Sequence, residues 1–411
     1  MLKKCAIIKN LTNENGIIKN HEHIYMPDQM TLGVELEIVG MASNYLYGTL
    51  IKGFKGKNDN TIKDEKYPGV EIISPILKSS NVDDVLGVAK QLTMLGEYTN
   101  NSCGGHIHIG ANYLEIKDDI QKINEEATKF VWKSLIEMWK SNEEIMYKIT
   151  NRTGEKHRGI EFAKPIAPKI EEMLAYDDTS MNVYGYKKML KNIQTEKEPY
   201  ENERYFSLNF SNLNDEKDTL EFRLANGTIE PKELKANIEL FMSFVDISKK
   251  IGIVRYKEKN KSKLTKKEEE LLKKYKEICT NIEISEEEKK NKLFEIMFDD
   301  EKRQIYDERY EKSTFNLEEE MQKIEHKSND HPNEYGEQLT NEEFKKLRNY
   351  KKNTREKEEV KFTQNDLEEL ADEIPKERIS RVRTFFKRII ELMQCHRIGK
   401  EEKSDKDDLE R

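Results

Sequence analysis

Five short segments of the chain alternate polar and apolar side chains with a period of two, which is typical of a β-strand. Successive side chains of a strand point to opposite faces of a sheet, so each segment would have one apolar and one polar face. This one-sided pattern predicts an antiparallel sheet with one face on a core. The segments are Gly33–Val39, Gly69–Ile73, Gly105–Ile109, Tyr205–Phe210 and Thr219–Leu224.

Three other segments have the apolar spacing of helices, namely Val82–Leu95, Asp118–Met146 and Pro231–Ile251. The third begins with a proline, which suits the first turn of a helix. Predicted strands and helices alternate irregularly, and no strand–helix–strand repeat is evident. We therefore expect an α+β fold with a largely antiparallel sheet and helices on one face.

The pattern changes after Val254, where lysine and glutamate alternate densely and strand signals almost disappear. Capping boxes at Thr265–Glu268, Ser285–Glu288 and Thr340–Glu343 predict new helices. An arginine-rich final helix is expected at Lys376–Met393. These features predict a domain at residues 1–254, a charged helical appendage at 255–398 and a disordered tail at 399–411.

Composition excludes several classes of protein. The chain has 71 Lys and Arg against 79 Asp and Glu, a net charge of -8 that gives no indication of nucleic-acid binding. No run of 18 apolar residues exists, so no membrane span is expected. Its four cysteines are far apart and form no CxxC pair, which argues against a disulfide framework or a zinc knuckle. These features predict a cytoplasmic protein.

The polar faces of the predicted strands carry the candidate chemistry. They contain no lysine in a lysine-rich chain, and carboxylates at this density would repel one another unless a cation lay among them. Carboxylate oxygens with an occasional imidazole suit magnesium or manganese. The residues on these faces include Glu35, Glu37, Glu71, His106, His108, Ser207, Asn209, Glu221 and Arg223.

Arginines could bind phosphate next to such a metal site. Arg223 shares a face with Glu221, Arg204 precedes a polar strand, and Arg152 lies in a turn-like segment. Guanidinium groups grip phosphate oxygens bidentately and could neutralise a transferring phosphoryl group. The sequence has no GxxxxGK[ST] phosphate loop, no GxSxG motif and no kinase-like set.

Three alternatives remain open on the residues alone. The first is a solvated sheet face on which acidic residues cluster by accident. The second is a metal-dependent hydrolase in which His106 and His108 bind zinc beside Glu35 and Glu37. The third is a non-catalytic binding protein that keeps the fold and works through its charged helices, the last of which could dock a partner.

Five motifs in a fixed order resemble the amidoligases, members of the glutamine-synthetase-like carboxylate–amine ligase superfamily. The motifs cover about 200 residues and do not reach the C-terminal region. Asp59-Asn60-Thr61 stands where the family often has an aspartate and a small hydroxyl residue, and Arg152 lacks the Tyr-Cys pair that usually follows it in the family. The motifs are GVELE at 33–37, GVEIISPIL at 69–77, CGGHIHIG at 103–110, RYFSLN at 204–209 and EFRLANGT at 221–228.

The resemblance implies a glutamine-synthetase-like catalytic domain that holds ATP and two or more Mg²⁺ or Mn²⁺ ions on the concave face of its sheet. A carboxylate would be joined to an amine through an acyl phosphate, on an amino acid, a peptide, a protein or a cell-wall peptide. Arg223, Arg204 and Arg152 would be catalytic. The metal ligands would be Glu35, Glu37, Glu71, His108 and Glu221, and ATP would contact His106, His108, Ser207, Asn209, Arg223, Gly227 and Thr228.

Overall fold

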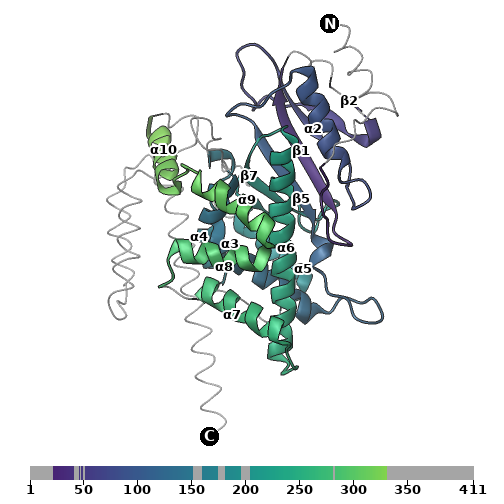
Figure 1. The fold of residues 1–411 in the computed structure, drawn as a ribbon, viewed down its shortest axis with the longest axis vertical. Helices are drawn as coiled ribbons and strands as arrows, with labels where there is room; N and C mark the ends of the chain where they lie inside the picture. The colour runs from purple at the N-terminus through teal and green to yellow at the C-terminus, as the bar shows by residue number, and fades with distance from the viewer. Residues whose placement is uncertain are drawn as a thin grey trace, which may run out of the picture. The chain divides into compact units, whose positions relative to one another are not determined.

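A seven-stranded antiparallel sheet lies at the centre of the part of the chain that the structure describes (Figure 1). This computed structural model describes residues 22–40, 46, 48–49, 51–150, 160–174, 181–195, 204–280 and 283–330. In spatial order the strands are β2 (Gly48–Thr49), β3 (Lys55–Asn58), β4 (Gly69–Ile73), β1 (Leu32–Val39), β5 (Gly104–Gly110), β7 (Thr219–Asn226) and β6 (Leu208–Asn209).

In the described part of the chain, helices connect these strands and follow the last of them. The longest are α3 (Glu125–Thr150) and α6 (Pro231–Lys259), and none of the described helices is long and apolar enough to cross a membrane. The described residues also form three 3-10 turns, η2 (Ile51–Gly53), η3 (Ala111–Leu114) and η4 (Ile160–Phe162). The other helices are α2 (Asp84–Leu95), α4 (Ala167–Leu174), α5 (Val183–Thr195), α7 (Lys266–Thr280), α8 (Glu286–Met297), α9 (Asp300–Glu311) and α10 (Leu317–Asp330).

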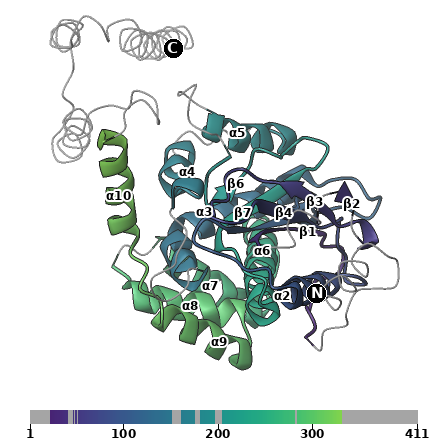
Figure 2. The same cartoon turned by 90° about the horizontal axis from the view of Figure 1, so that it is seen from above.

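The apolar face of the sheet packs on α2, α3 and α6 (Figure 2). Phe222 of β7 stacks on Phe241 of α6 with ring centroids 4.5 Å apart, and it lies 5.3 Å from Trp139 of α3. Phe244 of α6 meets the same tryptophan edge-on at 5.4 Å. Burial of these large side chains stabilises this layer and leaves the opposite face of the sheet for polar groups.

The mixed α and β composition and the antiparallel sheet that the sequence predicted are confirmed. Of the predicted segment Tyr205–Phe210, only the β6 residues pair with β7. The helix predicted from Asp118 begins instead at Glu125, because Gln121 has a φ of 62° and Lys117 bridges to Ile123 in a turn. The short strands β2 and β3 were not predicted.

Helices α7, α8 and α9 pack against α3 and α6 rather than standing apart. Two of the predicted capping boxes begin α7 and α8, since Glu268 N donates to Thr265 Oγ1 and Glu288 N to Ser285 Oγ. The predicted domain division after residue 254 stays a prediction, and α6 continues across it. The expected helices at Thr340–Glu343 and Lys376–Met393 and the tail at 399–411 lie outside the described residues.

Candidate active site

The polar face of the sheet gathers acidic and imidazole side chains from four strands and one turn, which we call the acidic strip. Ligand atoms in the strip form three groups, and within each group the atoms lie within 4.8 Å of one another. The groups share Glu35 and Glu71, so they are contiguous across the sheet. The acidic strip consists of Glu35, Glu37, Asp59, Glu71, His106, His108 and Glu221.

Strand register is what brings these residues together. Glu35 of β1 pairs with His106 of β5, and Glu37 of β1 pairs with Glu71 of β4. His108 of β5 pairs with Glu221 of β7. Directly paired residues of antiparallel strands have side chains on the same face, so residues distant in sequence become neighbours.

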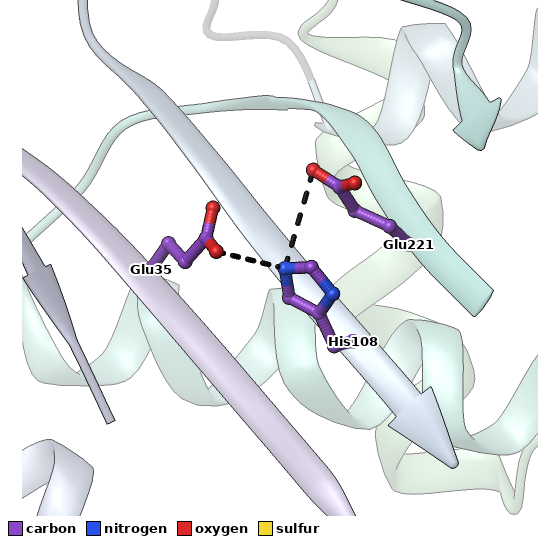
Figure 3. A group of neighbouring side chains, drawn as sticks. All are labelled: Glu35, His108 and Glu221. Carbon is purple, nitrogen blue, oxygen red and sulfur yellow. Dashed lines mark ion pairs between the residues drawn. The ribbon is translucent and has the colours of Figure 1, made fainter. Parts of the chain in front are cut away.

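Figure 3 shows the first group, in which Glu35 and Glu221 point toward the ring of His108 from either side. His108 Nε2 lies 3.2 Å from Glu35 Oε1 and 4.0 Å from Glu221 Oε1. The side chains of His108 and Glu221 are only 10% and 5% exposed. Two carboxylates and an imidazole therefore converge on one small region that has little contact with solvent.

The other two groups continue toward β4. Glu35, His106 and Glu71 form the second group, in which His106 Nδ1 lies 2.9 Å from Glu35 Oε2. The opposite ring nitrogen of His106 lies 3.5 Å from Glu37 Oε1. Glu37, Asp59 and Glu71 form the third group and contain no basic side chain.

Asp59 reaches the strip because of a close approach at Gly69. A Cβ at Gly69 would lie 2.3 Å from Ile62 Cβ and 2.8 Å from the Asp59 carbonyl, so only glycine allows this turn against the start of β4. The Asp59 carboxylate also accepts hydrogen bonds from Thr61 N at 2.8 Å and from the Thr61 hydroxyl. The sequence indicated Asp59 only through its resemblance to a family motif.

Electrostatics in the strip reflect an excess of negative charge. Burial disfavours the ionised form of Glu35, but hydrogen bonds from His106 and His108 outweigh it and hold the pKa of Glu35 well below its usual range. For Glu71, burial and the neighbouring Glu35 and Glu37 charges act together and raise its pKa to about 8. With this pKa, Glu71 keeps a proton at neutral pH, because burial and the nearby carboxylates disfavour its ionised form.

Histidine and arginine partly balance the other end of the strip. Burial disfavours the charged form of His108, yet Glu35 and Glu221 prevail and raise the pKa of His108 above its ordinary value. Burial likewise opposes ionisation of Glu221, while Arg223 and both histidines lower its pKa. The end near β7 is therefore a hydrogen-bonded cluster of opposite charges, whereas at the end near β4 the exposed Lys57 of β3 pairs with Glu71 across the strands.

Arg223 lies at an irregularity of β7. Gly105 pairs with Ala225 but Ile107 pairs with Phe222, so Arg223 and Leu224 together lie opposite His106 in a β-bulge. Such bulges redirect side chains at functional sites.

The guanidinium of Arg223 donates to Glu221 and lies 5.4 Å from the ring centroid of Tyr205. Arg204 lies 5.3 Å from the same ring. Tyr205 therefore has two guanidinium groups beside it, next to the acidic strip.

The remaining predicted site residues do not all lie at the acidic strip. Asn209 donates to Glu221 Oε2 at 2.7 Å and so joins the strip. Ser207 is fully buried and donates to Glu143 of α3, so its side chain lies with that helix and not with the strip. Arg152 lies outside the described residues.

Gly227 and Thr228 form the turn between β7 and α6. A Cβ at Gly227 would lie 2.7 Å from Cys103 Cβ, which explains the glycine. The Thr228 hydroxyl accepts from Glu230 N and donates to Glu233, so it stabilises the turn that precedes α6.

Part of the chain matches a known protein family. Residues 51–245 match the sequence profile of the family described as "Putative amidoligase enzyme". The match contains the strip residues of β4, β5 and β7 and begins after β1. The resemblance that the motifs implied is thus confirmed over residues 51–245, and the family description is that of a ligase-type enzyme. No curated protein matches the chain.

Proposed function

We propose that the protein is an ATP- and divalent-metal-dependent ligase that joins a carboxylate to an amine, on an amino acid or a peptide. The observation that carries this proposal is the convergence of the acidic strip beside Arg223. Carboxylates and imidazoles in three contiguous groups suit hard cations that also bind phosphate oxygens. The family match supports the ligase class of the activity.

The donor set of the strip is compatible with Mg²⁺ or Mn²⁺. Glu35, Glu71, His106, His108 and Glu221 would hold the ions, with Glu37 and Asp59 at the end near β4. When bound, the ions would neutralise the triphosphate of ATP and bind its oxygens. A cation beside Glu71 would also displace the proton that this carboxyl otherwise keeps.

The chain's own contribution is to position and neutralise. The substrate carboxylate attacks the γ-phosphorus of ATP, which forms a new phosphorus–oxygen bond and releases ADP. An amine then attacks the acyl carbon, phosphate leaves, and the nitrogen loses a proton to give the amide. Arg223 would face the transferring phosphoryl group, and Arg204 would add positive charge beside Tyr205. No side chain has to act as a nucleophile in this scheme.

Phosphate release from ATP with Mg²⁺ or Mn²⁺, measured over a panel of carboxylates and amines, tests the proposal. We expect release that depends on both substrates and falls by about 100-fold or more in Glu35→Gln and Arg223→Ala. Glu301→Gln and Arg303→Ala, on the outer surface of α9, are matched controls and should keep the parent's activity. Parent-like activity in both site variants would contradict the proposed site. Substrate hydrolysis without ATP would favour the metal-dependent hydrolase instead.

A further inference from the structure

A strap of residues 160–167 is tied to α3 by two side chains one helical turn apart. The Tyr147 hydroxyl donates to the Ala163 carbonyl. The Glu143 carboxylate accepts from the backbone nitrogens of Ile166 and Ala167, both at 2.9 Å. Glu143 and Tyr147 are almost completely buried, and neither belongs to the acidic strip.

Glu143 also holds the segment that leads to β6. The Ser207 hydroxyl donates to Glu143, and the Trp139 indole donates to the same oxygen at 3.1 Å. Two backbone amides, a hydroxyl and an indole donate to this carboxyl group, although burial prevails over them and raises the pKa of Glu143. One buried group therefore fixes the strap and Ser207 relative to each other.

Backbone hydrogen bonds extend this connection to β7. Lys164 N donates to the Tyr205 carbonyl, and Ser207 N donates to the Lys164 carbonyl, both at 2.8 Å. Arg223 N in turn donates to the Ser207 carbonyl at 2.8 Å. A continuous series of hydrogen bonds thus runs from Glu143 and Tyr147 to the strap. It continues from the strap to the segment that precedes β6, and from that segment to β7.

The side chain of Arg223 contacts both the strap and the segment that precedes β6. Its Nε donates to the carbonyl of Phe162, in the strap, at 3.4 Å. Its guanidinium faces the ring of Tyr205, and the Phe162 ring meets that tyrosine edge-on with centroids 5.4 Å apart. The strap therefore supplies one direct contact to the guanidinium and supports the aromatic ring that faces it.

We propose that Glu143 and Tyr147 are positioning residues that hold the Arg223 guanidinium beside the acidic strip by fixing the strap. The geometric part of this proposal stands on the contacts above. Its consequence for turnover rests on the proposed function, because Arg223 acts on phosphate only in that scheme. Misplacement of a charged group by about 1 Å can cost up to about 100-fold in rate.

Tyr147→Phe is the sharpest test, because it removes only the hydroxyl that holds Ala163. Tyr306→Phe is its matched control, since the Tyr306 hydroxyl donates to the Ala236 carbonyl from an equally buried site on α9. The direct measurement is the solvent exchange of the Arg223 Nε–H proton, followed by NMR in protein with ¹⁵N-labelled arginine. The missing signal of Arg223→Lys identifies the resonance.

We expect exchange at Arg223 to be at least about tenfold faster in Tyr147→Phe and in Glu143→Gln than in the parent, and unchanged in Tyr306→Phe. Turnover should fall about tenfold in the two strap variants, with little change in KM for the substrates. Should Glu143→Gln fail to fold, Tyr147→Phe alone decides.

Parent-like exchange in Tyr147→Phe would overturn the inference, and so would an equal acceleration in Tyr306→Phe. If the parent protein consumes no ATP, the proposed function fails while the exchange measurement still decides whether the strap positions Arg223.

Discussion

Single carboxylates determine the character of the site. Imidazole or guanidinium groups lower the pKa of Glu35 and Glu221, whereas burial and the nearby charges of Glu35 and Glu37 raise the pKa of Glu71 to about 8. A solvated acidic surface would not raise a carboxyl pKa in this way, because water would screen the charges. The raised pKa of Glu71 therefore favours a cation-binding site over an accidental cluster of acidic residues.

Binding of Mn²⁺ should depend on pH through Glu71. The ion needs an ionised carboxylate and a neutral imidazole, so below pH 8 it must displace the proton of Glu71 and any proton on His108, whose pKa is also raised. Affinity should therefore rise at least about tenfold per pH unit between about pH 6 and 8. Calorimetry in buffers of different ionisation enthalpy measures both affinity and proton release. Glu71→Gln should weaken binding and flatten this slope, and an unchanged slope in that variant would contradict the assignment.

The same raised pKa has a defined effect on the stability of the metal-free protein. The native state keeps a proton on Glu71 that the unfolded chain loses near the ordinary value of 4.5. Its contribution to stability is therefore complete below that value and is lost as the pH rises toward about 8. Bound cations should remove this loss.

At the scale of elements, the site depends on how closely α3 packs against α6. A Cβ at Gly252 of α6 would lie 2.3 Å from the Val131 Cα of α3, so the two helices touch backbone to backbone there. Helix α3 also carries Glu143 and Tyr147, which hold the strap. A shift of α3 would therefore displace the strap and, with it, the side chain of Arg223.

Gly252→Ala should destabilise the protein by about 1–3 kcal/mol or more, because the methyl group has to separate the two backbones. Gly185→Ala in α5 is the matched control, since its Cβ would mainly meet the flexible side chain of Met181 and alanine favours a helix. Urea unfolding of both variants measures the difference. Equal stability of the two variants would contradict the close packing of α3 on α6.

Elements with strong periodicity could be predicted, and much of the site with them. Four of the predicted strands, and the polar face that each presents, follow from alternation, whereas the register that places Glu35 beside His106 is seen only in the structure. Ser207 could not be placed from alternation, since β6 is only two residues long and a buried glutamate on α3 attracts its hydroxyl. The strap was not predicted either, because it depends on tertiary contacts of Glu143 and Tyr147.

The whole described molecule is built around one extensive core. Leu293 and Phe294 of α8 and Tyr306 of α9 are buried in the same hydrophobic cluster as the sheet residues Leu36 and Phe222. Charged helices that look like an appendage in sequence therefore complete the burial of α3 and α6. Exposed pairs such as Lys312 with Glu308 contribute little to stability individually, whereas Lys290 is buried and contacts Glu287, Asp307 and Glu311.

The claim on which the account depends is that the acidic strip holds cations that bind the phosphates of ATP. A crystal structure with Mn²⁺ and a non-hydrolysable ATP analogue, with anomalous scattering recorded at the manganese edge, tests it most directly. We predict manganese peaks within coordination distance of Glu35, Glu71 and Glu221, with the γ-phosphate facing Arg223. Manganese absent from the strip, or a nucleotide bound elsewhere on the protein, would contradict the account.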